Sequence, residues 1–79
     1  MKVLLFASAR DAAGCAEVEC DVPERATVQA ALERLAAEHP RLVELLPSCR
    51  AAIDDDFASR DAVIPEGAVL AVLPPVSGG

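Results

Sequence analysis

Lysine and aromatic residues are scarce in this sequence. Its 79 residues include no Trp, no Tyr, two Phe and a single lysine, Lys2. The basic residues are scattered and outnumbered by acidic ones, which gives a net charge of −6. No nucleic-acid partner is therefore expected, because phosphate contacts require clustered Lys and Arg. An acidic surface favours a basic protein partner instead.

Long apolar runs are also missing. No stretch approaches the roughly 20 apolar residues of a transmembrane helix. The short apolar run after Met1 is soon followed by the charged Arg10 and Asp11. We therefore expect no signal peptide, no membrane segment and a cytoplasmic location.

The cysteines are few, and their spacing matches no metal signature. Cys15, Cys20 and Cys49 form neither a C-x-x-C pair nor a zinc pattern. They are interpreted as small hydrophobic filler in a reducing compartment. His39 precedes Pro40 at the end of a predicted helix, where a partly cationic ring suits the helix dipole. No bound metal or cofactor is expected.

Two strands are predicted at the N-terminal end. The continuous apolar run Val3–Ser8 is typical of a central strand. Residues 10–14 form the connection, with Gly14 as a break. In the second strand, Val18, Cys20 and Val22 alternate with acidic residues, so one face of this strand is expected to be exposed to water. The first and second strands are expected to form a hairpin.

A single amphipathic helix follows. Thr27 is the expected N-cap, and Pro40 stops the helix. The residues on its buried side recur at helical spacing: Val28, Ala31, Leu32, Leu35 and Ala36. Leu42–Leu46 is expected to add one further turn that ends at Pro47.

The remaining strands complete the sheet. Two short strands, 51–54 and 57–59, flank the acidic turn 54–56, and the turn 65–67 leads into a last strand, 68–73. A helix packed on one face of a mixed four- to five-stranded sheet, with the first and last strands central, is an α+β fold of the β-grasp (ubiquitin-like) type. We assign residues 1–73 to this domain and residues 74–79 to a flexible tail.

The tail is the most informative segment. Pro74 and Pro75 end the last strand because neither can donate to a ladder. Gly78 and Gly79 have no side chains, so the main-chain carboxylate is sterically bare. Such a tail can thread a narrow channel and offer its carbonyl carbon to another enzyme.

The two central strands carry more apolar surface than one helix can cover. Both the odd and the even positions of the first and last strands are apolar. An uncovered apolar face on a small domain marks a partner surface, here beside the tail. The alternative is that residues 40–50 cover this face.

Six segments carry a further signal: Lys2–Ala7, Arg10–Gly14, Thr27–Val28, Ile53–Asp54, Pro65–Ala68 and Leu73–Gly79. Together they resemble the small subunit of molybdopterin synthase, a ubiquitin-like sulfur carrier of the MoaD/ThiS type. The most specific element is the proline pair followed by Val-Ser-Gly-Gly. That family commonly has Val-Asn-Gly where this chain has Ile53-Asp54-Asp55, and Asp adopts much of the turn geometry of Asn.

The resemblance implies a non-catalytic carrier that works within a heterotetramer. A partner similar to ubiquitin-activating enzymes would use ATP to adenylate the Gly79 carboxyl group. A sulfur donor would then displace AMP and leave a Gly79 thiocarboxylate. In the large synthase subunit, this sulfur would pass to cyclic pyranopterin monophosphate and form the molybdopterin dithiolene.

The resemblance also implies which residues contact partners: Phe6, Phe57, Leu73, Pro74, Pro75, Val76, Ser77 and Gly78. For Phe57, core packing under the sheet edge is the alternative. Two other functions stay open. One is a sulfur carrier for thiamine thiazole or tRNA thiolation, and the other is a ubiquitin-like interaction or conjugation module that is never thiolated.

Overall fold

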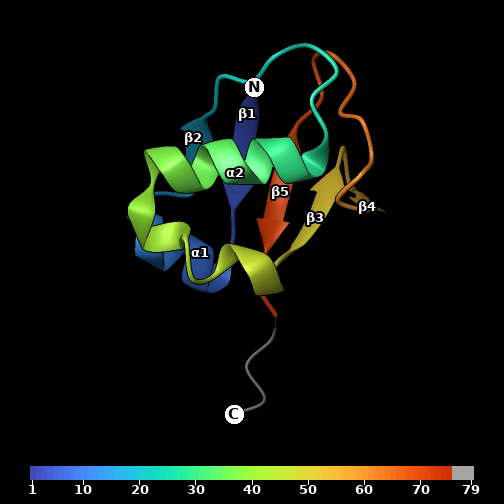
Figure 1. Cartoon of the computed structure of the whole chain (residues 1–79). Helices are drawn as coiled ribbons and strands as arrows, with labels where there is room; N and C mark the ends of the chain where they lie inside the picture. The colour runs from blue at the N-terminus through green and yellow to red at the C-terminus, as the bar shows by residue number, and fades with distance from the viewer. Residues whose placement is uncertain (76–79) are drawn as a thin grey trace.

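The fold is built on a mixed sheet of five strands, crossed on one face by a single long helix (Figure 1). This computed structural model describes residues 1–75; the predicted tail residues Val76, Ser77, Gly78 and Gly79 lie outside the described residues. The strands are β1 (Lys2–Leu5), β2 (Glu17–Glu19), β3 (Arg50–Ile53), β4 (Asp56–Ala58) and β5 (Leu70–Leu73).

The strand order is β2-β1-β5-β3-β4, with β1 parallel to β5 and the other pairs antiparallel. The predicted mixed sheet, with the first and last strands away from its edges, is confirmed. So is the antiparallel pairing of the first two strands, in which Val3 lies opposite Val18.

The core lies between the sheet and the helix α2 (Val28–Glu38). From β1 and β5, Val3, Leu5, Leu70 and Val72 are at most 2% exposed. The register places Val3 beside Leu70 and Leu5 beside Val72, so these four side chains form one block under the helix. Burying each such side chain contributes about 1.5–3 kcal/mol to the free energy of unfolding.

Helix α2 begins and ends where the sequence predicts. The Thr27 hydroxyl accepts a hydrogen bond from the Ala30 amide at 3.1 Å, which is an N-cap contact. His39 is the C-cap, immediately before Pro40. The buried side consists of Val28, Ala31, Leu32 and Leu35, while Ala36 is only partly buried.

A second, short helix was not predicted. Helix α1 (Ala7–Ala13) follows β1 directly, where a strand to Ser8 and a connecting loop were expected. Its alanines favour a helix, and Gly14 adopts φ 80° as the C-cap, donating to the Arg10 carbonyl. The prediction was wrong because the apolar run continues from β1 into the helix and hides the change of period.

The segment after α2 also differs from the prediction. It contains two 3-10 turns, η1 (Pro40–Leu42) and η2 (Leu46–Ser48), so Pro47 lies inside a turn instead of ending one. Proline is tolerated at the start of a helical turn because that amide has no intrahelical partner. Leu42 and Leu46 are buried and join the core beside α2.

The two expected turns are present. Asp54 and Asp55 connect β3 to β4 with φ values of 48° and 74°, a left-handed geometry that Asp tolerates. The Asp54 carboxylate also accepts a hydrogen bond from the Val69 amide at 2.9 Å, which ties this turn to the start of β5. Gly67 has φ 79° in the turn that precedes β5, and the strand begins at Leu70, two residues later than predicted.

Arg60 joins three distant segments, which the sequence does not reveal. Its Nη2 atom donates to the carbonyl oxygens of Leu46, Pro47 and Cys49 at 2.8, 3.1 and 3.1 Å. Its Nη1 atom donates to the Gln29 side chain at 3.2 Å. The guanidinium therefore ties the segment after β4 to η2 and to the beginning of α2.

Replacing Arg60 with Met is expected to lower the free energy of unfolding by about 1–3 kcal/mol, because partly buried carbonyls lose their donor. In a domain of this size each kcal/mol shifts the melting temperature by about 4–8 °C. Thermal melts followed by circular dichroism measure the change. The matched control is Arg41→Met. Because Arg41 is exposed, this change should alter the free energy of unfolding by no more than about 0.5 kcal/mol. Equal melting temperatures for the two variants would contradict the role given to Arg60.

Candidate functional site

Strand β5 leads directly to the predicted tail. It lies between β1 and β3 and is hydrogen-bonded to both, so the base of the tail is held on two sides. The strand ends at Leu73; Pro74 is half-buried and Pro75 is exposed. The chain leaves at the lower end of the molecule in Figure 1, the end at which α1 lies.

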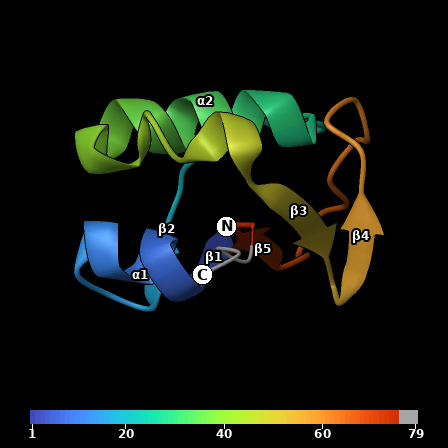
Figure 2. The same ribbon diagram turned by 90° about the horizontal axis from the view of Figure 1, so that it is seen from below.

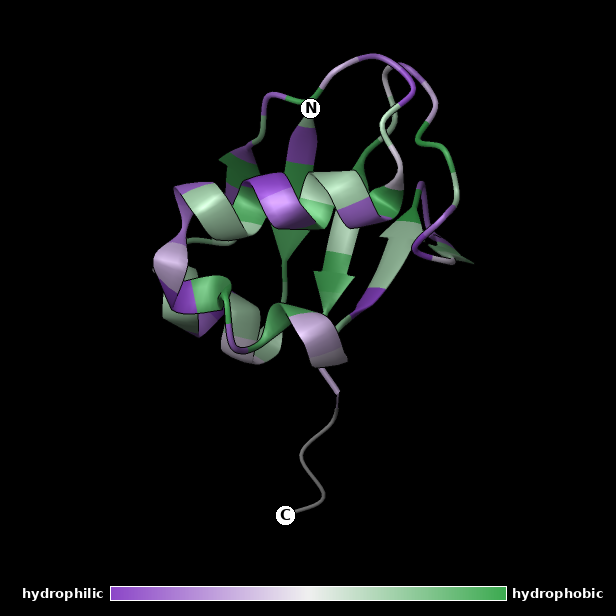
Figure 3. Ribbon diagram, in the orientation of Figure 1, coloured by the Kyte–Doolittle hydropathy of each residue, from purple (hydrophilic) through white to green (hydrophobic). Residues whose placement is uncertain are grey.

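The two faces of the sheet are covered very differently. Seen from below, α2 lies over one face, and none of the described elements lies beneath β5, β3 and β4 (Figure 2). We call the face opposite α2 the open face. Its strand registers align one row across all five strands: Glu17, Leu4, Ala71, Ala52 and Phe57. In Figure 3, β1 and β5 have the green of hydrophobic residues, paler over part of β5, and only the start of β1 is hydrophilic. The first residue of β1 is Lys2.

The predicted docking residues Phe6, Phe57 and Leu73 reach this open face. Phe57 is 64% exposed and Phe6 44% exposed, while Leu73 is partly exposed. Leu73 pairs with Arg50, two residues before Ala52, and Ala52 pairs with Phe57. Because side chains alternate between faces along a strand, Leu73 and Phe57 point the same way. Core packing of Phe57, the alternative interpretation, is wrong.

Phe6 is positioned by an abrupt change of backbone direction. Its amide donates to the Val72 carbonyl at 3.3 Å, which fixes it beside the end of β5. The next residue, Ala7, has φ 49°, a left-handed conformation that costs a non-glycine residue about 1–2 kcal/mol. The chain turns there into α1, and the Phe6 ring is left partly exposed next to the tail.

Residues 40–48 do not cover the open face. They lie on the same side of the sheet as α2 (Figure 2), and Leu42 and Leu46 pack into the core there. The alternative that this segment covers the apolar face left uncovered by α2 is therefore wrong.

Arg50 completes the exposed group, although no sequence pattern selects it. Its guanidinium carbon lies 4.0 Å from the centroid of the Phe57 ring, in a cation–π contact. The contact joins β3 to β4 and forms on the open face. Only the strand register, which places Arg50 opposite Leu73, could have shown this neighbourhood.

The cysteines divide into two kinds. Cys20 and Cys49 are buried, as predicted, and burial raises the pKa of both thiols. Cys15 is exposed, so its interpretation as hydrophobic filler is wrong. His39 is half-buried at the end of α2. Within residues 1–75, no group of three or more His, Cys, Asp or Glu side chains is placed to hold a metal ion.

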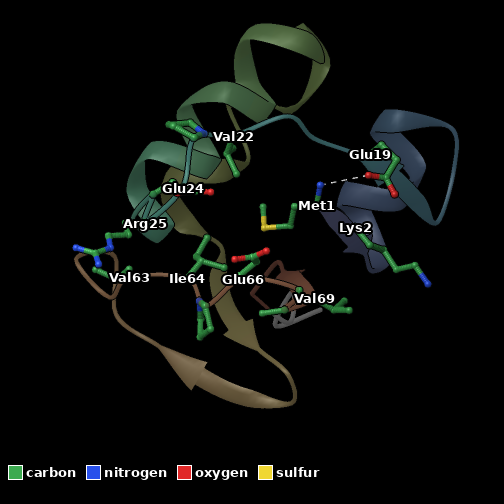
Figure 4. A pocket seen from close by; sticks show the side chains of 15 residues that line it. Met1, Lys2, Glu19, Val22, Glu24, Arg25, Val63, Ile64, Glu66 and Val69 are labelled. Atoms are coloured by element: carbon green, nitrogen blue, oxygen red, sulfur yellow. Dashed lines mark hydrogen bonds and ion pairs between the residues drawn. The ribbon is translucent and has the colours of Figure 1, made fainter.

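A groove of about 830 Å³ lies at the opposite end of the molecule, where β1 and β5 begin. Figure 4 shows Met1, Val22 and Ile64 around it, with Glu24 and Glu66 nearby. Because the tail leaves where these parallel strands end, this groove is separate from the candidate site. None of the helices formed by residues 1–75 has the length and apolar character needed to cross a membrane.

Comparison with known proteins shows relatives that match the whole chain. The ThiS family model matches residues 3–79. The chain is 33% identical to a molybdopterin synthase sulfur carrier subunit of Arabidopsis thaliana, covering 100% of this chain and 82% of that protein. It is 35% identical to the protein so named in Escherichia coli K12, covering 100% of this chain and 99% of the relative.

Solved structures agree in fold. SAMP1 from Haloferax volcanii superposes with a TM-score of 0.88 at 32% identity, covering 100% of this chain and 98% of that one. A putative molybdopterin converting factor subunit 1 from Pyrococcus furiosus has a TM-score of 0.83 at 30% identity, with 95% of both chains covered. These neighbours confirm the predicted ubiquitin-like β-grasp fold. With a central strand leading to the tail, an uncovered apolar face beside it and relatives matched along its whole length, the chain belongs to the ThiS family.

Proposed function

We propose that this chain is the sulfur carrier subunit of a molybdopterin synthase. The observation that carries the proposal is the likeness over 100% of the chain to relatives named as that subunit. The fold is consistent with it, because the central strand β5 directs the chain toward Gly79 from a base held on both sides.

The chemistry would take place at the Gly79 carboxyl group. A carboxylate is a poor electrophile, so an adenylyltransferase similar to ubiquitin-activating enzymes would first join it to AMP, using ATP and releasing pyrophosphate. A hydrosulfide equivalent from a sulfur donor would attack the carbonyl carbon and expel AMP. The product is a thiocarboxylate, whose sulfur is a soft nucleophile.

The chain would then act as a carrier and not as a catalyst. The thiocarboxylate would enter the large synthase subunit, where its sulfur would bond to a carbon of cyclic pyranopterin monophosphate. Water would then cleave the acyl–sulfur bond and regenerate the Gly79 carboxylate, so two such transfers would supply the two sulfurs of the dithiolene. The chain itself would bind no metal or cofactor, and the assembly would be a cytoplasmic heterotetramer. Phe6, Phe57 and Leu73 would dock on the partner, and residues 74–78 would occupy its entry channel.

The division of labour explains the arrangement of the surface. Docking through a rigid sheet face supplies affinity, while the tail supplies the reacting atom. Glycines at positions 78 and 79 add no Cβ, so one tail can fit the active sites of both the activating enzyme and the synthase.

An intact-mass measurement tests the proposal. Chain purified from cells that contain the activating enzyme should carry one sulfur in place of one oxygen, and the substitution should map to Gly79. Chain from cells lacking that enzyme should be unmodified. The thiocarboxylated chain, mixed with the large subunit and cyclic pyranopterin monophosphate, should yield molybdopterin. Unmodified chain in the first cells, or no product in the mixture, would contradict the proposal.

A second candidate function has its own support. SAMP1, at 32% identity, is described as a small archaeal modifier protein, which fits a ubiquitin-like conjugation module. In that case the Gly79 carboxyl group would form amide bonds with other proteins. Immunoblots of cell extracts separate the two functions, since conjugation gives a ladder of heavier species and sulfur transfer does not. Transfer assays with thiazole or tRNA acceptors test the other sulfur carriers.

A further inference from the structure

We propose that Arg50, stacked on Phe57, is a specificity-determining residue of the docking face and pairs with a carboxylate of the large synthase subunit. This inference deepens the proposed function and rests on it. It names the chemistry that the partner must present beside the docking residues: an acidic side chain at the rim of an apolar surface.

Arg50 stands close to both the docking residues and the tail. It is the first residue of β3 and lies opposite Leu73, the last residue of β5. Its side chain is exposed and extends toward Phe57, which lies on the neighbouring strand β4. Any partner that contacts Leu73 and Phe57 together must therefore also meet Arg50.

The charge of Arg50 is not compensated within residues 1–75. Lys2, also on the open face, lies 3.7 Å from Glu17, and the amino-terminal nitrogen lies 3.3 Å from Glu19. No carboxylate of the described residues is within ion-pair distance of the Arg50 guanidinium. Arg50 thus adds an uncompensated positive charge to the open face of an otherwise acidic chain, beside the more exposed of the two aromatic rings.

The stacked geometry prepares this charge for recognition. A guanidinium lying over a ring uses its flat face for the contact, while its five N–H donors point outward from its edge. The 4.0 Å contact therefore restricts the side chain without consuming its hydrogen-bonding capacity. Two parallel donors match the two oxygens of a carboxylate, which gives a directional contact that an ammonium group does not provide.

A single charged pair at this position would determine orientation and partner choice. Apolar contacts alone are tolerant of rotation and of the wrong partner. An uncompensated Arg that meets an apolar surface without a carboxylate would lose hydration and gain nothing, which disfavours that partner. Because Arg50 is next to the end of β5, the same pair would align the tail with its channel.

The test uses titration calorimetry of the full chain with the large subunit encoded in the same genome. Arg50→Gln should weaken binding about tenfold or more, as expected for loss of an interfacial Arg contact. Arg50→Lys should recover only part of the affinity, because an ammonium group has no flat face to stack on the Phe57 ring and no pair of parallel donors for the two carboxylate oxygens. The matched control is Arg34→Gln on the far side of α2, where binding should change by less than about twofold.

Ionic strength provides a second readout that a purely structural role would not move. The dissociation constant of the native chain should rise more steeply with sodium chloride than that of Arg50→Gln, because the paired charge is screened by salt. A charge swap tests the pair directly. Arg50→Glu should weaken binding, and changing the acidic partner residue of the large subunit to Lys should restore it. Melting temperatures of all variants establish that they are folded.

The outcomes are distinguishable. Native chain that binds, with Arg50→Gln equal to it in affinity and salt dependence, overturns the role of Arg50 and leaves the proposed function standing. Tighter binding by Arg50→Gln also overturns it, since Arg50 would then only shield Phe57. Native chain that fails to bind the large subunit overturns the proposed partner, and this inference with it.

Discussion

Deletion of Gly79 is expected to abolish sulfur transfer completely. The reacting carboxyl group would then belong to Gly78 and lie one residue, or about 3.5 Å, short of its place in each partner's active site. Misplacement of this size disrupts the alignment that group transfer needs. Replacement of Gly79 by Val should fail as well, because a branched side chain would enter the channel in both enzymes.

The measurement is molybdopterin formation in the presence of the activating enzyme, ATP, a sulfur source and the large subunit. Intact mass tells which step fails. Melting temperature should not change, because the folded strands end at Leu73. The exposed loop variant Glu24→Gln is the control and should retain full activity. Molybdopterin formed by the deletion variant would rule out Gly79 as the site of sulfur.

Replacing Phe57 with Lys is expected to weaken binding to the large subunit about thirtyfold or more. A buried aromatic anchor contributes about 2 kcal/mol or more at an interface hot spot, and each 1.4 kcal/mol is about a factor of ten. The free chain should hardly be affected, because Phe57 is 64% exposed. Its cation–π contact with Arg50 is worth only about 0.5–1 kcal/mol at an exposed site.

Val63→Lys is the matched control, since Val63 is also an exposed apolar residue, at 53%, but lies by the groove at the far end. Binding titrations and thermal melts on both variants give the result. Loss of binding by Phe57→Lys alone, with both melting temperatures preserved, supports the open face as the docking surface. Equal binding by the two variants would exclude Phe57 from the interface.

Periodic segments were predicted well because their information is local. Helix α2 was found with its N-cap and stop, since Thr27 and Pro40 act within one turn of the helix ends. The second strand was found because its acidic and apolar residues alternate. Helix α1 was missed because its alanines continue the apolar run of β1, so no change of periodicity marks where the strand ends and the helix begins.

The candidate site was predicted only in part. Phe6, Phe57 and Leu73 were selected by resemblance, and the apolar surplus of the central strands indicated that a partner surface exists. Neither signal decided whether Phe57 is exposed. Arg50 gave no signal at all, because its importance depends on the strands that flank it.

A β-grasp domain with one main helix, an uncovered apolar strand face and a Gly-Gly tail could all be predicted from patterns in the sequence. Which of the two sheet faces is open depends on the tertiary packing of α2. Leu4 and Leu5 are equally apolar, and burial of Leu5 follows from α2 crossing that side of the sheet. The tertiary structure also brought Arg50 to Phe57 and Arg60 to η2. Such contacts join segments that are distant in the chain, so no local pattern encodes them.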